Sequence, residues 1–157
     1  MKAYSTRYKF SQHFDFPAEE AYRWCTSYDP GDLSLMGEKG RRDVRRISEN
    51  VLLLTDRTRQ GEGYTTKRKI VLLYPERLAW TSTHVSGPAK HSQFLYEIVP
   101  EGRAASRLEF TGFQVTYGDK ELSSSENASY AERLRKEDSG AWRLLAQAME
   151  RDLKRRK

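Results

Sequence analysis

The most chemically versatile side chain in this sequence is His84, because histidine is the residue whose ordinary pKa lies close to neutral pH. It could act as an acid, a base or a hydrogen-bond donor. Arg68 lies in a basic run, and a buried arginine needs an anionic partner such as Glu97, Glu109 or a ligand carboxylate. With Gln114, these two side chains could bind a polar molecule and move its protons. The alternative is a structural role, in which His84 is hydrogen-bonded to a neighbouring residue and Arg68 lies on the surface.

Other kinds of site have little support in the sequence. His13, His84 and His91 are widely separated, and no cysteine pair or HExxH motif accompanies them, so we expect no metal. Cys25 is the single cysteine, which excludes an intramolecular disulfide and is best explained by packing. Gly61-Glu62-Gly63 lacks the rest of any nucleotide-binding fingerprint. We therefore expect no cofactor.

The chain combines a hydrophilic composition with many aromatic residues. It has 157 residues, a mean hydropathy of -0.85, three Trp, nine Tyr and six Phe. This length predicts a single domain over residues 1–157, and the aromatic content argues against general disorder. No apolar run approaches the length of a membrane span, and the start has no apolar signal region. We expect a cytoplasmic protein.

The net charge of +6 is concentrated in two segments, 39–46 and 151–157. Alternate residues of a strand face opposite sides, so Arg41, Arg42, Arg45 and Arg46 predict one outward pair and one pair facing the interior. A helix end explains the second segment without a partner. With no nucleic-acid-binding motif present, we expect weak contact with anionic membranes rather than specific binding to nucleic acid. An adaptor that binds an anionic partner through both segments is an alternative.

The pattern of the chain predicts an antiparallel meander closed by a helix. Aromatic residues alternate from Tyr4 to Phe14, which favours a first strand. Pro17 starts a short helix that ends before Asp29-Pro30-Gly31, and a second short helix covers 32–36. Turn residues then delimit strands at 41–48, 51–57, 64–74, 77–86, 91–99 and 106–117. A long amphipathic helix follows from residue 128, where Gly140 marks a kink or a close backbone approach.

This order resembles that of the START-related or SRPBCC superfamily, the helix-grip fold of the birch pollen allergen, polyketide cyclases and lipid-transfer domains. The resemblance covers nearly the whole chain and is carried by residues 15–22 (DFPAEEAY), 64–70 (YTTKRKI), 78–80 (LAW), 96–102 (YEIVPEG) and 141–150 (AWRLLAQAME). It implies an α+β fold: a curved seven-stranded antiparallel sheet wrapped around a long C-terminal helix, with two short helices between strands 1 and 2. It also implies a cavity between sheet and helix.

Placed on that fold, inward-facing strand and helix positions would line the cavity. They form an aromatic wall with a few polar groups, as a ligand site requires; the alternative is that they simply fill a core. The ligand would enter between the short helices, the Gly61–Gly63 hairpin and the long helix. The expected lining residues are Tyr8, Phe10, Phe14, Arg68, Ile70, Leu72, Trp80, Ser82, His84, Phe94, Tyr96, Phe110, Gln114, Leu145 and Met149.

The resemblance implies binding or carrying of an apolar or amphipathic small molecule, such as a lipid, a polyketide or an isoprenoid-like compound. A polyketide cyclase or dehydratase that uses His84 and Arg68 is the enzymatic alternative, because cyclisation needs proton transfer near an enolate. Exposed strand edges permit either a monomer or a homodimer.

Overall fold

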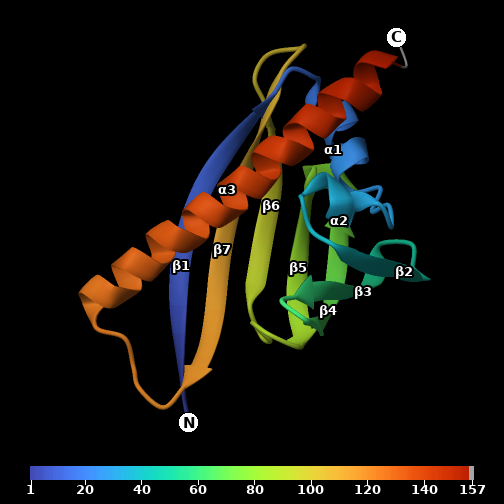
Figure 1. Ribbon diagram of the computed structural model, residues 1–157. Helices are drawn as coiled ribbons and strands as arrows, with labels where there is room; N and C mark the ends of the chain where they lie inside the picture. The colour runs from blue at the N-terminus through green and yellow to red at the C-terminus, as the bar shows by residue number, and fades with distance from the viewer. Residues whose placement is uncertain (156–157) are drawn as a thin grey trace.

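Residues 1–155, which the computed structural model describes, form one antiparallel sheet, three α-helices and a 3₁₀ turn (Figure 1). The helices are α1 (Ala18–Cys25), α2 (Asp32–Leu35) and α3 (Ser124–Arg155), and the 3₁₀ turn is Pro75–Arg77. The strands are β1 (Lys2–Phe14), β2 (Gly40–Ser48), β3 (Val51–Gln60), β4 (Gly63–Tyr74), β5 (Ala79–Ser86), β6 (Gln93–Pro100) and β7 (Ser106–Gly118). The predicted element order and α+β class are confirmed.

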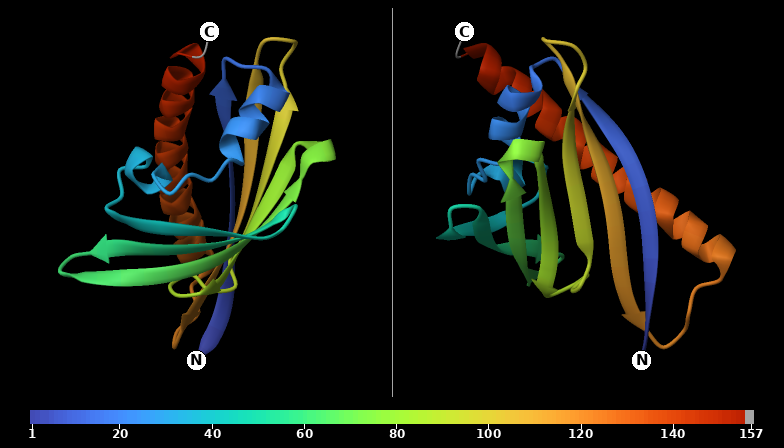
Figure 2. Two further views of the ribbon diagram at one scale, coloured as in Figure 1. Left: turned by 90° about the vertical axis from the view of Figure 1, so that its right-hand side faces the viewer. Right: turned by 180° about the vertical axis from the view of Figure 1, so that it is seen from behind.

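The sheet follows the order β1-β7-β6-β5-β4-β3-β2, so the first two strands of the chain are its two edges. The sheet twists strongly: β2 and β3 run crosswise to β1 and β7 (Figure 2, left). The helix α3 lies diagonally over the concave face, mainly along β1, while α1 contacts β6 and β7 and α2 lies beside β2 (Figure 1). The space that the helices and the curved sheet enclose is therefore bounded on several sides.

The strand β1 shows why alternation identifies a half-buried strand. Thr6, Tyr8 and Phe10 are buried while the residues between them are exposed. Phe10 stacks on Phe110 of β7 with ring centroids 4.5 Å apart. Burial of such rings in a shared apolar layer is the main favourable contribution to folding here.

The long helix begins four residues earlier than the sequence pattern predicts. Ser123 and Glu126 form a capping box, in which the Glu126 amide donates to the Ser123 hydroxyl at 3.2 Å and the Ser123 amide donates to the Glu126 carboxylate at 3.0 Å. Gly140 lies within the continuous helix, and a Cβ there would meet no atom within 4 Å. The predicted close backbone approach at Gly140 is therefore wrong.

Two strands begin later than predicted because of turn geometry. The 3₁₀ turn and the left-handed Leu78 (φ 50°) delay β5 to Ala79. His91 also has a left-handed backbone (φ 74°), and β6 therefore starts at Gln93. None of the helices formed by residues 1–155 is both long enough and apolar enough to cross a membrane.

Candidate functional site

A cavity of about 840 Å³ lies between the sheet, the short helices and α3. Its volume falls within the range of small-molecule sites, roughly 300–1,000 Å³. The sheet contributes Arg42, Leu54, Lys69, Trp80, Ser82 and Tyr96. The helical side contributes Glu20, Arg23, Trp24, Cys25, Ser27, Tyr28, Asp29, Gly31, Asp32, Leu35, Met36, Trp142, Leu145, Asp152 and Leu153. The exposed residues among these, Arg23, Ser27, Asp29 and Gly31, place the mouth at the end of α1 and its connection to α2.

Aromatic rings form one wall of this cavity. Trp80 and Tyr96 stack with centroids 4.7 Å apart and planes 2° from parallel. Trp142, reaching down from α3, lies 6.3 Å from Trp80 and 5.8 Å from Tyr96. Trp24 on α1 also borders the cavity, and its indole donates to Asp152 at 3.0 Å. All three tryptophans of the chain therefore line the same space.

A buried ionic network forms the polar wall. Asp56 of β3 is 2% exposed, and Arg42 binds it through two bonds, Nε to Oδ1 at 2.7 Å and Nη2 to Oδ2 at 2.9 Å. Lys69 Nζ lies 2.9 Å from the same Oδ2. Asp32 of α2 faces the other side of Arg42 at 3.7 Å. Register explains the cluster, since Arg42 pairs with Asp56 across β2 and β3, and Lys69 lies on the next strand.

The network shifts the pKa values of its members in different directions. Burial alone would raise the pKa of Asp56, but the bonds from Arg42 and the charge of Lys69 lower it to about 2. Burial lowers the pKa of Lys69, partly offset by Asp56. Burial raises the pKa of Asp32, partly offset by Arg42. Asp56 is consequently held as a carboxylate, and the two cations face the cavity around it.

Comparisons with known proteins establish the fold. No family model matches the chain, and no curated protein matches it. Among solved structures, the Zhui aromatase/cyclase from Streptomyces sp. R1128 superposes with a TM-score of 0.77 at 11% identity, covering 96% of each chain. A protein of unknown function from Staphylococcus aureus, SA2116, gives a TM-score of 0.75 at 10% identity over 98% of each chain. Norcoclaurine synthase from Thalictrum flavum, in complex with dopamine and hydroxybenzaldehyde, gives a TM-score of 0.68 at 13% identity over 99% of this chain and 90% of that one.

This chain has the helix-grip fold. Identities this low show the fold alone. The roles of individual side chains must therefore be inferred from their positions in this structure. The predicted resemblance and fold class are confirmed.

Four of the predicted lining residues border the helix-grip cavity: Trp80, Ser82, Tyr96 and Leu145. Others are buried in the core beside it without bordering it, namely Tyr8, Phe10, Phe94 and Phe110. Phe14 and Met149 border a second, smaller space of about 170 Å³ at the far end of β1. The structural alternative, that aromatic residues simply fill a core, therefore applies to part of the predicted set.

The prediction for β4 is wrong about which face points inward. Arg68 is exposed and Leu72 is 36% exposed, while the alternate residues Lys69 and Val71 face the interior. Ile70 is half-buried on the same outer face as Arg68. Apolar and basic residues occupy both faces of this strand, so the alternation that identifies the inner face elsewhere is missing here.

His84, Arg68 and Gln114 do not form a common site. His84 is inside the molecule at 8% exposure, with its ring 5.0 Å from that of Phe94, but it does not border the cavity. Gln114 is half-buried on β7 and also lies outside the cavity lining. Burial, assisted by the nearby charges of Lys69 and Lys67, lowers the pKa of His84 to about 3. The histidine is therefore neutral at physiological pH.

Of the predicted entrance, the short helices and the long helix border the cavity and the hairpin does not. The hairpin at Gly61–Gly63 does not border the cavity, whereas the 26–31 connection does. Tyr28 in this connection has a left-handed backbone (φ 45°), and its ring lies 5.8 Å from the Arg42 guanidinium. The sequence contained one signal for the missed network: Asp56 shares its strand face with Leu52 and Leu54, an inward position where an acid needs a cation.

A hydrogen bond also joins sheet and helix beside the cavity. Tyr8 of β1 donates to Asp138 of α3, and burial, followed by the Asp138 charge, raises the pKa of Tyr8. Gly112 lies opposite Tyr8 in the β1–β7 register, and a Cβ there would approach the Tyr8 ring to 2.5 Å. The glycine thus leaves room for the tyrosine that fixes the middle of α3.

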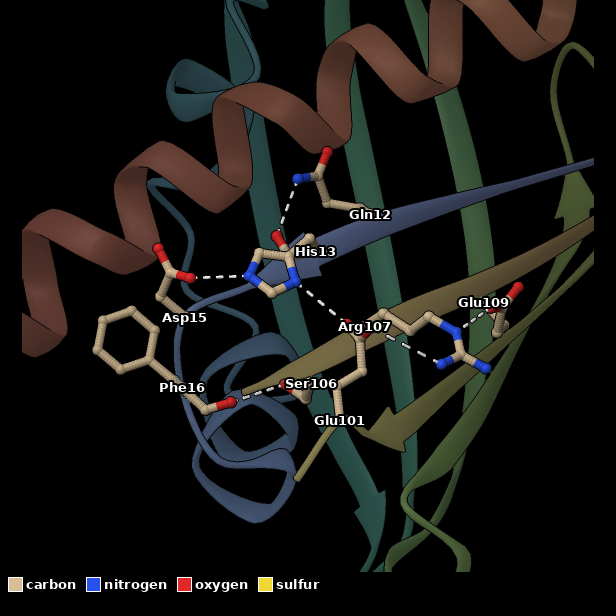
Figure 3. Close-up of polar contacts among 8 residues, drawn as sticks. All are labelled: Gln12, His13, Asp15, Phe16, Glu101, Ser106, Arg107 and Glu109. Carbon is tan, nitrogen blue, oxygen red and sulfur yellow. Dashed lines mark hydrogen bonds and ion pairs between the residues drawn. The ribbon is translucent and has the colours of Figure 1, made fainter. Parts of the chain in front are cut away.

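A second polar cluster, at the end of β1, is exposed (Figure 3). His13 lies between Asp15 and Glu101, at 2.7 and 3.1 Å, and hydrogen bonds to Asp15 and then Glu101 raise its pKa. The Ser106 hydroxyl nearby donates to the Phe16 carbonyl at 2.8 Å. These contacts join β1 to the β6–β7 hairpin, and we assign them a structural role. Among residues 1–155, no group of His, Cys, Asp and Glu has the arrangement of a metal site.

The two basic segments are separate in space, with α1 and α2 between β2 and the C-terminal end of α3 in Figure 1. Of the arginines in β2, Arg42 faces the cavity and is buried, whereas Arg41 and Arg45 are exposed. Arg46 is also exposed, so only one arginine of the predicted inward pair faces the cavity. Arg156 and Lys157, also part of the second basic segment, lie outside the described residues.

Proposed function

We propose that this chain binds or carries an apolar or amphipathic small molecule in the cavity beneath α3. The observation that supports it is the cavity itself: about 840 Å³, with the stacked Trp80–Tyr96 pair in its wall beside charged and polar side chains. Apolar area gives affinity, and sparse polar groups orient the ligand. The norcoclaurine synthase complex is consistent with this, since that neighbour holds two small aromatic molecules on a similar fold.

The enzymatic alternative loses the pair of residues on which it depended. Arg68 is on the outer face and His84 is inside the molecule, away from the cavity lining. The adaptor alternative has no observation in its favour. The expected cytoplasmic location, weak membrane contact, monomer or homodimer state and single domain over residues 1–157 stay predictions.

Binding can be measured with the neutral probe N-phenyl-1-naphthylamine, whose fluorescence rises in apolar surroundings. Since Trp24, Trp80 and Trp142 all border the cavity, a probe inside it accepts their excitation energy and quenches tryptophan emission. We expect saturable binding accompanied by this quenching. Absence of saturable binding, or binding without quenching, would contradict the proposal.

A matched pair of variants tests the location. Ser82 borders the cavity, whereas the adjacent Thr81 faces the other side of β5, so Ser82→Phe places a ring inside the cavity and Thr81→Phe adds the same ring outside it. We expect S82F to weaken probe binding about tenfold or more, because the new ring occupies space in which the probe would make apolar contact. We expect T81F to leave probe binding unchanged. Equal effects of the two substitutions would place the probe elsewhere. Mass spectrometry of molecules that co-purify with the native protein would then identify the ligand.

A further inference from the structure

The acidic side chains that border the cavity all lie on one of its two sides. On the sheet side, the polar side chains are Arg42, Lys69, Ser82 and Tyr96, all hydrogen-bond donors and none of them acidic. The acidic side chains that border the cavity all come from the helical side: Glu20, Asp29, Asp32 and Asp152. The sheet side of the cavity therefore presents donors and positive charge without an acid, whereas the helical side presents all four acids together with Arg23.

Three of these donors lie on successive strands. Lys69 of β4 pairs with His84, two residues from Ser82 on β5, and Ser82 pairs with Phe94, two residues from Tyr96 on β6. Diagonal neighbours of this kind lie about 7–8 Å apart, within reach of long side chains. The three donors thus follow one diagonal across the wall of the cavity.

The donors on this diagonal have capacity left for a ligand. Asp56 already accepts two bonds from Arg42 and one from Lys69, which leaves further Lys69 N–H groups without an acceptor. Neither the Ser82 nor the Tyr96 hydroxyl has a hydrogen-bond partner within residues 1–155. A ligand that displaces water from these groups must offer an acceptor in its place, which a ligand oxygen would do.

We propose that the ligand has an aromatic or otherwise apolar body and an anionic oxygen end, and that this end binds Lys69 with support from the Ser82 and Tyr96 hydroxyls. This inference rests on the proposed function and adds a chemical class to it. The body would lie against the stacked Trp80 and Tyr96 rings, and the anion would lie beside the ionic network. A hydrogen bond from an ammonium to an anion is stronger than a hydrogen bond between neutral groups. We therefore expect the affinity to depend on the charge of the ligand.

Two probes of the same shape separate charge from apolar contact. 1-Anilinonaphthalene-8-sulfonate carries a sulfonate, and N-phenyl-1-naphthylamine has the same ring system without it. Lys69→Met keeps the length of the side chain and removes its charge. We expect K69M to weaken binding of the sulfonate about tenfold and to change binding of the neutral probe less than twofold.

The chain offers a matched control in Lys67. It is half-buried on the same face of the same strand, two residues away, and does not border the cavity. K67M removes the same charge at a position outside the cavity lining. It should therefore leave the binding of both probes unchanged. If K67M weakens sulfonate binding as much as K69M does, the effect is general electrostatics and the proposal is wrong.

A third variant keeps the test decisive if K69M does not fold. Tyr96→Phe preserves the ring stacked on Trp80 and removes only the hydroxyl. We expect Y96F to weaken sulfonate binding about threefold and to leave the neutral probe unchanged. If both probes bind the wild-type protein and these substitutions affect them equally, the anionic end is refuted while the proposed function stands. If neither probe binds the wild-type protein, the proposed function itself fails.

Discussion

The carboxylate of Asp56 is the point at which the cavity wall is most sensitive to a single substitution. It is 2% exposed and accepts bonds from two cations, and the Arg42 and Lys69 side chains are only 5% and 19% exposed. Asp56→Asn keeps the volume and removes the charge, so both cations lose the anion between them. Breaking a buried ion pair in this way costs about 3–5 kcal/mol of unfolding free energy.

Urea unfolding followed by circular dichroism measures this cost directly. Asp43→Asn is the control, because Asp43 is 63% exposed beside Arg41 and its loss should change stability by less than about 0.5 kcal/mol. Adding Lys69→Met to D56N should restore part of the stability, because one of the two uncompensated cations is removed. A D56N protein within about 1 kcal/mol of wild type at pH 7 would refute the description of Asp56 as the anion that holds the wall together.

The effect of Asp56→Asn on stability should also depend on pH. The folded pKa of Asp56, about 2, is below its ordinary value of 3.8, so the folded state favours the ionised form. The stabilisation is therefore complete above pH 4 and is lost as the pH falls through 2. The shift corresponds to about 2 kcal/mol, and the gap between wild type and D56N should narrow by that amount in acid.

Three further substitutions test separate features. The pKa of buried His84, lowered to about 3, lies below its ordinary value of 6.5, so the unfolded chain binds the proton first and stability falls as the pH drops from 6.5 towards 3. His84→Gln should remove about 2 kcal/mol of that loss between pH 6.5 and 4.5. Identical dependence of stability on pH in H84Q and wild type would contradict this. G140A should raise unfolding free energy by about 1 kcal/mol in urea melts, since nothing lies near the added methyl group. G112A should lower it by about 1–3 kcal/mol by displacing the Tyr8 ring, and Y8F in the same background should not restore it because the ring remains.

The sequence predicted the features that depend on a clear period. The alternation in β1 and the amphipathic stripe of α3 each identify one buried face, and both elements form as expected. In β4, by contrast, Arg68 and Lys69 are adjacent basic residues and Ile70 and Val71 adjacent apolar ones, so neither face is distinguished. The inner face there is set by Asp56 on the neighbouring strand.

The helical half of the cavity was beyond sequence analysis for a different reason. Its residues belong to α1, α2 and the connection between them, whose position depends on the left-handed Tyr28 and on the ion pair between Asp32 and Arg42. Both are long-range consequences of the completed fold. Local patterns identified the short helices without indicating that they bring acids to one side of a donor-lined wall.

The order of strands in the sheet also has a consequence for how the cavity forms. β1 is the first strand of the chain, but it pairs with β7, so that Lys2 lies opposite Gly118. Strands β2 to β7 each pair with their neighbours in sequence and can assemble through short loops, whereas β1 must wait for the slow closure of a long one. Because α1 and α2 follow β1 directly, we expect the helical wall to be placed in that last step. Pulsed hydrogen exchange would then detect protection in β3 to β6 before β1, and a ligand would find a finished cavity only after β1 had paired with β7.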